Sequence, residues 1–331
     1  MISLATLTKR IVASQSNREI QKSVMELYNF FNEQGAFLDM SDDDIALEYG
    51  YALSVKHASD CIKDYKRTHA FTKGVYQAIE KLRHEHGNST LRILYAGSGP
   101  YAPLVLPLLF LYKEEEIDLK VTIIDINTHS VSSVKNLVKL FGIERFMEKV
   151  QVADAINYQD PDHKGYHLIV TETMFHALTR EPQVAITRNL KDQLREDGIF
   201  IPEEIHISMG YSFFSKEPYL NQFGTKYEVK NQDSSSNRKG LQNLFSLTKS
   251  SVLATDFYES DWIEFKLDKQ TPDLCIFTKI QVYKDIELKD SDSLITNPLC
   301  IKSLSWLARN GIAKFKLIYS LKESPKWTLA V

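Results

Sequence analysis

Two glutamates, Glu172 and Glu181, lie nine residues apart, directly after an apolar run at 166–171 that predicts a buried strand. A pair of carboxylates can bind a planar cation through charge-assisted hydrogen bonds, and one of the pair can accept its proton. The alternative is two exposed loop acids, because Glu181 precedes Pro182 and a predicted helix, whose N-terminus stabilises a nearby carboxylate. His176 lies between the glutamates and is a third candidate, as a proton acceptor or as a polar wall. The spacing favours a site for a cationic substrate.

A glycine turn precedes this pair in the chain. Gly97 and Gly99, followed by Ala102, satisfy a Gly-x-Gly-x-x-Gly/Ala pattern after a short predicted strand. The pattern alone is weak, and a tight turn with nothing bound remains its alternative. Asp125 ends the next predicted strand, where a carboxylate can accept both hydroxyl groups of a ribose or can cap the following helix. Asp154 ends the third predicted strand, where its side chain can lie beside an adenine ring or can simply belong to a turn. In this order the residues predict a site for a nucleoside-bearing cofactor.

The elements that must position these residues alternate between strand and helix from 91 to 202. This alternation predicts an α/β fold with a parallel, doubly wound sheet. We expect strands at 93–96, 121–124, 149–153, 167–170 and 199–201, and helices from about 103, over 131–141 and over 184–194.

The chain on either side of this unit has a different pattern. Residues 1–90 are predicted to form helices that act as a lid, over 20–31, from Ser41 with Asp44 in a capping box, and over 58–82. Apolar residues alternate with polar ones after Pro202, which predicts an antiparallel β domain over 203–331. The alternating segments are 205–207, 263–267, 276–282 and 315–321, and an exposed loop is expected over 230–240. The expected domains are therefore 1–90, 91–202 and 203–331.

Composition argues against several classes of protein. The 331 residues are 43% hydrophobic and 25% charged, with a formal net charge of −3 and both signs interspersed. Nucleic-acid binding normally needs concentrated basic charge, which this sequence lacks. The longest apolar run, 103–112, is far shorter than the roughly 18 residues that span a bilayer. The three cysteines of the sequence have scattered spacings that fit neither a disulfide framework nor a zinc site. We expect a cytoplasmic protein with no metal, nucleic acid or membrane partner.

Two segments outside the glycine turn carry a family resemblance. Residues 63–68 read Lys-Asp-Tyr-Lys-Arg-Thr, and 171–174 read Thr-Glu-Thr-Met with Glu181 following. Over about 45–205 the chain resembles the protein arginine methyltransferases, class I S-adenosylmethionine-dependent enzymes with a Lys-Asp-x-x-Arg-Thr helix and a Ser-Glu-x-Met hairpin. The resemblance implies an N-methyltransferase for a guanidino or amino group of arginine, an arginine-like metabolite or a peptide. It implies a cofactor site formed by Arg67, Gly97, Gly99, Asp125, Asp154 and Ala155, and a substrate site formed by Glu172, Met174 and Glu181.

The sequence also departs from that family. Tyr95 replaces an acid, Tyr101 replaces the third glycine of the turn, and Phe175-His176 replaces Gly-Tyr. No Thr-His-Trp loop follows in the C-terminal half. These differences favour a small molecule or short peptide with a cationic nitrogen as the substrate, and the chain could form a homodimer. Two other functions stay open, a small-molecule O-methyltransferase and a non-catalytic Rossmann-like scaffold.

Overall fold

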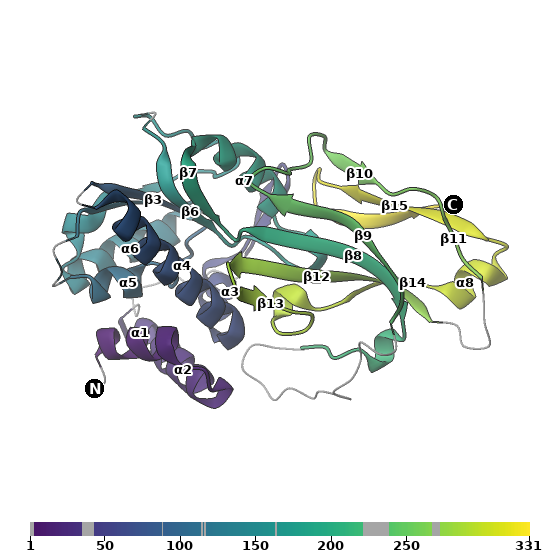
Figure 1. Ribbon diagram of the computed structural model, residues 1–331, viewed down its shortest axis with the longest axis horizontal. Helices are drawn as coiled ribbons and strands as arrows, with labels where there is room; N and C mark the ends of the chain where they lie inside the picture. The colour runs from purple at the N-terminus through teal and green to yellow at the C-terminus, as the bar shows by residue number, and fades with distance from the viewer. Residues whose placement is uncertain are drawn as a thin grey trace.

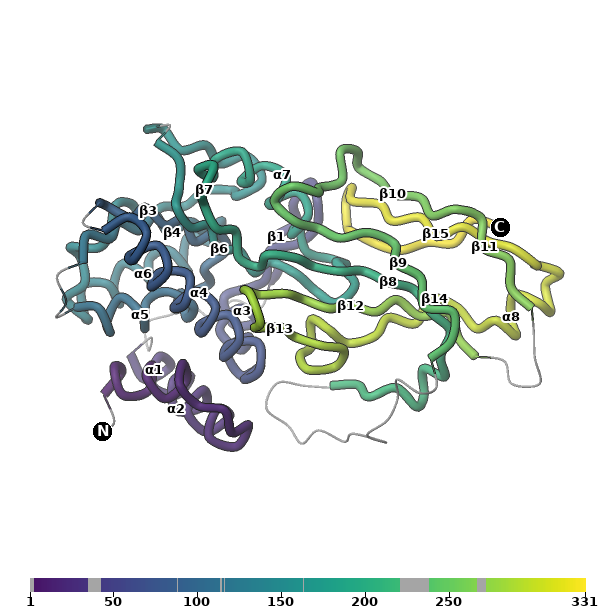
Figure 2. Tube along the Cα trace, in the orientation of Figure 1, coloured from purple at the N-terminus to yellow at the C-terminus, as the bar shows by residue number. Residues whose placement is uncertain are grey.

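The protein has two parts, a parallel sheet covered by helices and an elongated antiparallel β region that extends away from it (Figure 1). The N-terminus lies beside the first part, and the C-terminus lies in the second (Figure 2). The computed structural model describes residues 3–34, 43–87, 89–113, 115, 117–162, 164–220, 238–266 and 272–331.

Five parallel strands form the central sheet in the order β5-β4-β3-β6-β7. Every residue of β3 and β6 is buried, as expected for inner strands of a sheet covered on both faces. The predicted doubly wound α/β fold is therefore confirmed. The strands are β3 (Leu91–Ala96), β4 (Leu119–Asp125), β5 (Met147–Val152), β6 (Tyr166–Thr171) and β7 (Leu194–Ile201).

Helices cover this sheet, and α4 connects it to the second part of the molecule. A Cβ atom at Gly74 in α4 would lie 2.9 Å from Val282 Cγ1, so the helix packs tightly on the C-terminal sheet. The first two helices lie against α4 and α5. The helices are α1 (Leu4–Ala13), α2 (Asn17–Gln34), α3 (Val55–Asp60), α4 (Tyr65–His86), α5 (Leu106–Leu111), α6 (Thr128–Phe141) and α7 (Gln183–Leu190).

The predicted antiparallel region consists of two sheets. One has the order β13-β12-β8-β9 with β14 beside β12, and the other has β10-β15-β11 with β16 beside β15. The parallel sheet ends at Ile201 and the first antiparallel strand begins at Glu204. The elements are β8 (Glu204–Ser212), β9 (Lys239–Thr248), β10 (Phe257–Glu259), β11 (Ile263–Glu264), β12 (Asp273–Tyr283), β13 (Ile286–Leu288), β14 (Leu299–Ser303), α8 (Leu304–Arg309), β15 (Lys314–Ser320) and β16 (Lys326–Ala330).

The helix predicted to begin at Ser41 is wrong over its described part, although Ser41 itself lies outside the described residues. A short hairpin forms instead, from β1 (Ile45–Leu47) and β2 (Gly50–Ala52). Asp44 does not cap a helix at this point, because its carboxylate accepts the backbone N–H of Ser54 at 2.8 Å. A capping-box pattern was present, but tertiary contacts decided the local structure.

The ends of other predicted helices and loops also differ from the observed ones. The helix predicted over 58–82 is interrupted at Asp64, which accepts the N–H of Arg67 and caps α4. The helix predicted to reach 194 ends at Leu190, because Leu194 already belongs to β7. Most of the loop predicted over 230–240 lies outside the described residues, and its last part is wrong because β9 begins at Lys239.

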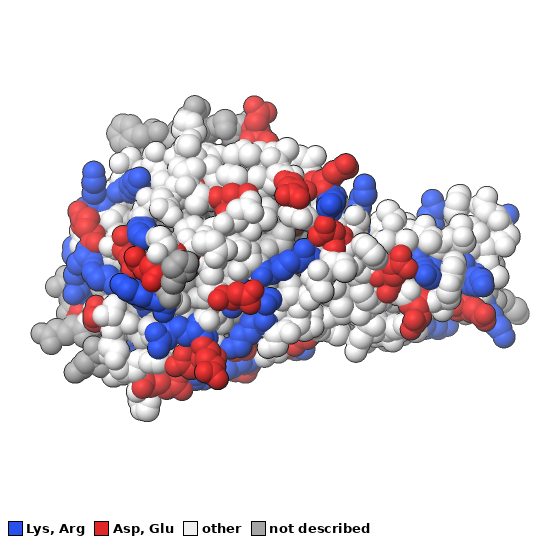
Figure 3. All heavy atoms as spheres, turned by 90° about the horizontal axis from the view of Figure 1, so that it is seen from above, with Lys and Arg blue, Asp and Glu red and all other residues white. Residues whose placement is uncertain are grey.

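The described surface gives no sign of a single charged face in the view of Figure 3, where basic and acidic side chains are interspersed. Within the described ranges, no helix is long and apolar enough to cross a membrane.

Candidate active site

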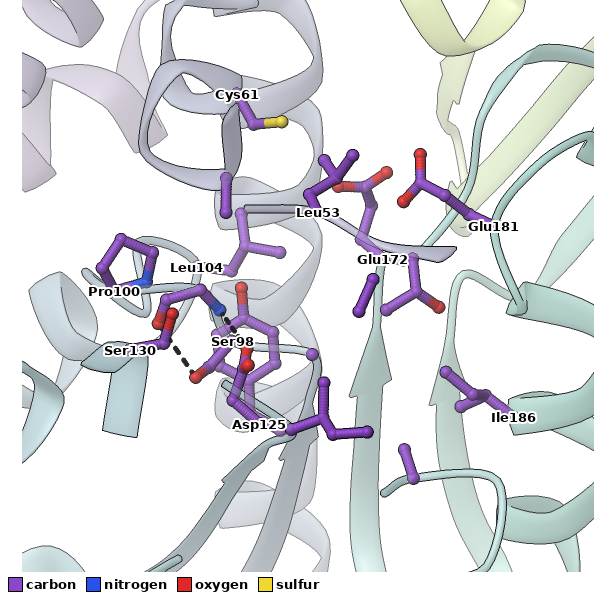
Figure 4. A pocket seen from close by; sticks show the side chains of 18 of the residues that line it. Leu53, Cys61, Ser98, Pro100, Leu104, Asp125, Ser130, Glu172, Glu181 and Ile186 are labelled. Carbon is purple, nitrogen blue, oxygen red and sulfur yellow. Dashed lines mark hydrogen bonds between the residues drawn. The ribbon is translucent and has the colours of Figure 1, made fainter. Parts of the chain in front are cut away.

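A cavity opens at the carboxyl ends of the parallel strands, where ligands bind in open α/β sheets. It encloses about 1040 Å³ of empty space, including its open mouth. Figure 4 shows the carboxylates of Glu172 and Glu181 near each other at one end and Asp125 toward the other. Eight predicted site residues line the cavity: Arg67, Gly97, Gly99, Asp125, Asp154, Ala155, Glu172 and Glu181.

Strand register explains why residues distant in sequence meet here. Ala96 of β3 pairs with Ile124 of β4 on one side and with Thr171 of β6 on the other. The residues that follow these three are Gly97, Asp125 and Glu172. They therefore form one row at the sheet edge, with the glycine turn between the two acids.

The glycine turn is held by Asp125. Gly97 and Gly99 have φ values of 72° and 61°, and residues that carry a Cβ atom rarely adopt such backbone angles. The Gly99 N–H donates to Asp125 Oδ2 at 2.8 Å, and the Asn127 N–H donates to Oδ1 at 2.8 Å. Burial raises the pKa of Asp125, although these two N–H groups oppose the shift. Asn127, and not Asp125, caps α6, so the helix-cap alternative for Asp125 is wrong.

The two tyrosines that depart from the family pattern both line this cavity. Tyr95 lies on the central strand β3, and burial followed by the charge of Glu172 raises its pKa well above the ordinary value. Tyr101 stacks on Phe31 of α2, with ring centroids 5.3 Å apart. The residue that replaces the third glycine therefore connects the N-terminal helices to the turn.

Arg67 and Glu172 form a buried ion pair at the other end of the cavity. Arg67 Nη1 lies 3.0 Å from Glu172 Oε2, and Arg67 Nη2 donates to the Cys61 carbonyl at 2.8 Å. Burial raises the pKa of Glu172, and the Arg67 guanidinium opposes that shift. Among the described residues, Glu172 Oε1 is buried without a hydrogen-bond partner. A polar atom in this state is costly unless a ligand provides the missing donor.

Glu181 lacks the partner that Glu172 has. Burial, and then the charge of Glu172, raises the pKa of Glu181 to about 8. No side chain within the described ranges forms an ion pair with it. The carboxylate lines the cavity, whereas the cap position of α7 is Pro182 and makes no side-chain cap. Two carboxylates thus line the cavity, and Arg67 pairs with only one of them, Glu172.

Two residues predicted for the site are placed elsewhere. Met174 is buried in the hydrophobic core, and His176 is buried against Phe175 with ring centroids 4.2 Å apart. Neither belongs to the described residues that line the cavity. Burial lowers the pKa of His176 to about 4. Because its ring does not line the cavity, the geometry does not support a catalytic contact for this residue. Their position in sequence between the glutamates does not place them in the site.

The β1–β2 hairpin contributes residues that sequence reasoning missed. Leu47 and Tyr51 line the cavity, and the Tyr51 N–H donates to the Arg180 carbonyl at 2.9 Å. A Cβ atom at Gly50 would lie 2.3 Å from the same carbonyl oxygen, and Gly50 has a φ of 124°. The hairpin therefore packs directly against the residue before Glu181. Only a glycine at position 50 hints at this contact in the sequence.

The C-terminal part also reaches the start of α4. Ser293 Oγ and the Leu294 N–H donate to Asp64 Oδ2 at 2.7 and 2.9 Å. Asp64 lies three residues before Arg67 and caps the same helix. The sequence shows no Thr-His-Trp loop, but a C-terminal turn nevertheless fixes the helix that carries Arg67.

Comparisons with known proteins show which solved structures share this architecture. No family model matches the sequence, and no curated protein matches it. Solved structures do match along most of their length. A Trypanosoma brucei PRMT1 enzyme–prozyme heterotetrameric complex with AdoHcy has a TM-score of 0.50 and 14% identity, covering 82% of this chain and 96% of that one. Arabidopsis thaliana protein arginine methyltransferase 10, in an open conformation, has a TM-score of 0.52 and 13% identity, covering 82% and 97%.

A third match is a PRMT6 structure with SAH, at a TM-score of 0.50 and 11% identity, covering 80% of this chain and 96% of that one. The chain therefore has a class I methyltransferase fold. More particularly, it has the fold of the protein arginine methyltransferases, with the parallel sheet followed by the antiparallel β domain.

Proposed function

We propose that the protein is an S-adenosylmethionine-dependent N-methyltransferase acting on a guanidino or amino group of arginine, an arginine-like metabolite or a short peptide. The observation that carries this proposal is the cavity itself. It combines a glycine turn and a strand-end aspartate with two buried carboxylates, of which only Glu172 is paired with an arginine. The fold, and the AdoHcy or SAH named with two structures of the same fold, support the choice of cofactor.

The residues of the cofactor end fit such a group. Asp125 would accept the ribose hydroxyls, because its two hydrogen bonds to backbone N–H groups leave further lone pairs. The glycine turn would lie against the methionine portion, and Arg67 would bind its carboxylate. Asp154 and Ala155 would flank the adenine. Among the described residues, no group of His, Cys, Asp or Glu side chains is arranged to hold a metal.

The carboxylate pair addresses the chemical difficulty of the substrate. S-adenosylmethionine supplies an electrophilic methyl group on a positively charged sulfur. A guanidinium is also cationic, keeps its proton up to a pKa above about 12, and is a poor nucleophile while delocalised. Glu172 and Glu181 would bind its planar N–H groups, offset the repulsion between the cations and fix the attacking nitrogen near the methyl group.

The two glutamates have different surroundings and so different proposed roles. Arg67 holds Glu172 in one orientation, which suits it to align the substrate through its free Oε1. Glu181 has no such partner and a pKa of about 8, close to that of an effective general base. As the new N–CH₃ bond forms, the nitrogen loses a proton, and Glu181 would accept it.

The direct test has a binding and a catalytic arm. Calorimetry with S-adenosylhomocysteine is expected to show saturable binding, and mass spectrometry is expected to detect methylation of free arginine, arginine peptides or agmatine. Binding without methylation of any cationic nitrogen, but with methylation of hydroxyl compounds, would favour the O-methyltransferase alternative. Failure to bind S-adenosylhomocysteine would leave the non-catalytic scaffold as the better description.

The pH dependence provides a further prediction. The uncharged form of Glu181 cannot balance a guanidinium, and this form dominates in the free protein below about pH 8. We therefore expect kcat/KM for an arginine peptide to rise about tenfold per pH unit between pH 6 and 7, and to level off above 8. The substrate keeps its charge throughout this range. Steady-state rates from pH 6 to 9 check this, and a profile that is flat or falls with pH would contradict the role of Glu181.

A further inference from the structure

We propose that three side chains of the C-terminal domain, Thr278, Tyr319 and Trp327, are positioning residues for the active site. They hold the turn at 176–180, which presents Glu181 to the cavity. This inference rests on the proposed function, because it assigns the antiparallel domain a part in methyl transfer beyond binding substrate or forming oligomers.

The three side chains bond to two consecutive residues of the turn. The Ala177 N–H donates to Thr278 Oγ1 at 3.0 Å, and Trp327 Nε1–H donates to the Ala177 carbonyl at 2.9 Å. The Tyr319 hydroxyl donates to the Leu178 carbonyl at 2.5 Å. All five residues are buried in the protein. Both backbone groups of Ala177 are therefore satisfied by side chains from a distant part of the chain.

The conformation of the turn shows why it needs these bonds. Ala177, Leu178 and Arg180 have φ values of 54°, 56° and 67°. Residues with a Cβ seldom adopt this left-handed region, and a leucine there persists only when its surroundings impose it. The sequence 176–180 contains no glycine that would favour such a path. Contacts with the C-terminal domain must therefore supply the constraint.

The constraint extends to Glu181 along the backbone. The Arg180 N–H donates to the Pro325 carbonyl at 2.8 Å, and its carbonyl accepts from Tyr51 N–H at 2.9 Å. The Glu181 N–H donates to the Thr179 carbonyl at 2.8 Å. The main chain is thus fixed from Ala177 up to the residue whose carboxylate lines the cavity.

Two sheets of the C-terminal domain converge on this turn. Thr278 belongs to β12, whereas Tyr319 of β15 and Trp327 of β16 are direct partners in the other sheet. The Tyr319 and Trp327 rings lie 5.0 Å apart, and both contact Phe245 of β9 in an aromatic cluster. Because such packed rings allow little motion, the donors reach the turn from a rigid support.

The test uses full-length variants that remove one hydrogen bond with little change in shape. Tyr319→Phe and Thr278→Val are each expected to lower kcat for methylation of an arginine peptide by about tenfold, because small displacements of catalytic groups slow the reaction strongly. Affinity for S-adenosylhomocysteine should stay within about twofold, since the Asp125 end of the cavity is untouched. Thr278→Ser retains the hydroxyl and should restore the rate.

Tyr258→Phe is the matched control. The Tyr258 ring belongs to the same aromatic cluster, 5.1 Å from Phe245 and 6.2 Å from Trp327, but it has no bond to the turn in the described structure. This variant should keep wild-type kcat. Hydrogen exchange of 174–182 should be faster in Tyr319→Phe and Thr278→Val than in the wild type, and unchanged in Tyr258→Phe.

The outcomes separate this inference from the proposed function. Faster exchange together with lower kcat supports it. Unchanged exchange, or faster exchange with unchanged kcat in an active enzyme, overturns it, because the bonds would then be merely structural. A wild-type protein that methylates no cationic nitrogen contradicts the proposed function, while the exchange comparison still decides whether these side chains hold the turn.

Discussion

Replacement of Glu181 by glutamine is expected to remove most methyl transfer and, at the same time, to stabilise the folded protein near pH 8. The substitution preserves shape but removes the charge that would balance the guanidinium and the group that would take its proton. Activity should fall by about 10²–10⁴-fold, the range that general-base and electrostatic contributions span. Affinity for S-adenosylhomocysteine should change little, because the glycine turn and Asp125 are unaltered.

The gain in stability follows from the raised pKa of Glu181. An ordinary glutamate loses its proton near pH 4.5, whereas burial and Glu172 hold the proton on Glu181 up to about pH 8. Between these values the folded state binds more protons than the unfolded state, so the contribution of Glu181 to stability falls as pH rises. Glutamine does not ionise. The variant should therefore lie within about 1 kcal/mol of the wild type near pH 5 and exceed its free energy of unfolding by about 4 kcal/mol at pH 8.

Glu172→Gln provides the contrast. It should also lose activity by orders of magnitude. Its gain in stability at pH 8 should be smaller than that of Glu181→Gln, because the Arg67 guanidinium, 3.0 Å away, partly offsets the burial that raises the pKa of Glu172. The activity losses should be strongly non-additive in the double variant, because both carboxylates act on one cation. Chemical denaturation at pH 5 and 8, with turnover on an arginine peptide, measures both effects. Near-wild-type turnover in both single variants would contradict the guanidinium assignment.

The sequence predicted the central sheet, and which residues lie at its carboxyl edge, because both depend on local patterns. Short apolar runs followed by Gly97, Asp125 and Glu172 predict strands whose carboxyl ends meet at one edge. The parallel register of β4, β3 and β6 then brings these residues together, so that the strand ends alone predict their proximity. Eight of the predicted residues consequently line one cavity.

The parts that were missed depend on contacts between distant segments. The β1–β2 hairpin packs against Arg180, and Asp64 interrupts a predicted helix where Ser293 and Leu294 bind it. Hydrophobic spacing contains no information about such partners. His176 was proposed because it lies between the glutamates in sequence, but the left-handed turn at 176–180 buries it away from the cavity. That turn is itself imposed from β12, β15 and β16.

Asp125→Ala is expected to cause the largest loss at the cofactor end, lowering S-adenosylhomocysteine affinity roughly 10–100-fold. The change would remove the acceptor for the ribose hydroxyls, and each hydrogen bond to a charged group contributes about 1.5–3 kcal/mol. It would also release the Gly99 N–H, which Asp125 now holds at 2.8 Å. Calorimetry on the folded variant measures the loss, with far-ultraviolet circular dichroism to confirm folding.

Two further variants separate the two roles of Asp125. Asp125→Asn keeps one side-chain oxygen, which can still accept the Gly99 N–H, but it loses the charge and part of the capacity to accept from a ribose. Its affinity should lie between those of the wild type and Asp125→Ala. Asp154→Ala is the strand-end control: Asp154 Oδ1 accepts the Ile156 N–H at 2.9 Å within its own turn, so the loss of affinity should be smaller. If Asp125→Ala binds S-adenosylhomocysteine as tightly as the wild type, Asp125 does not contact the cofactor.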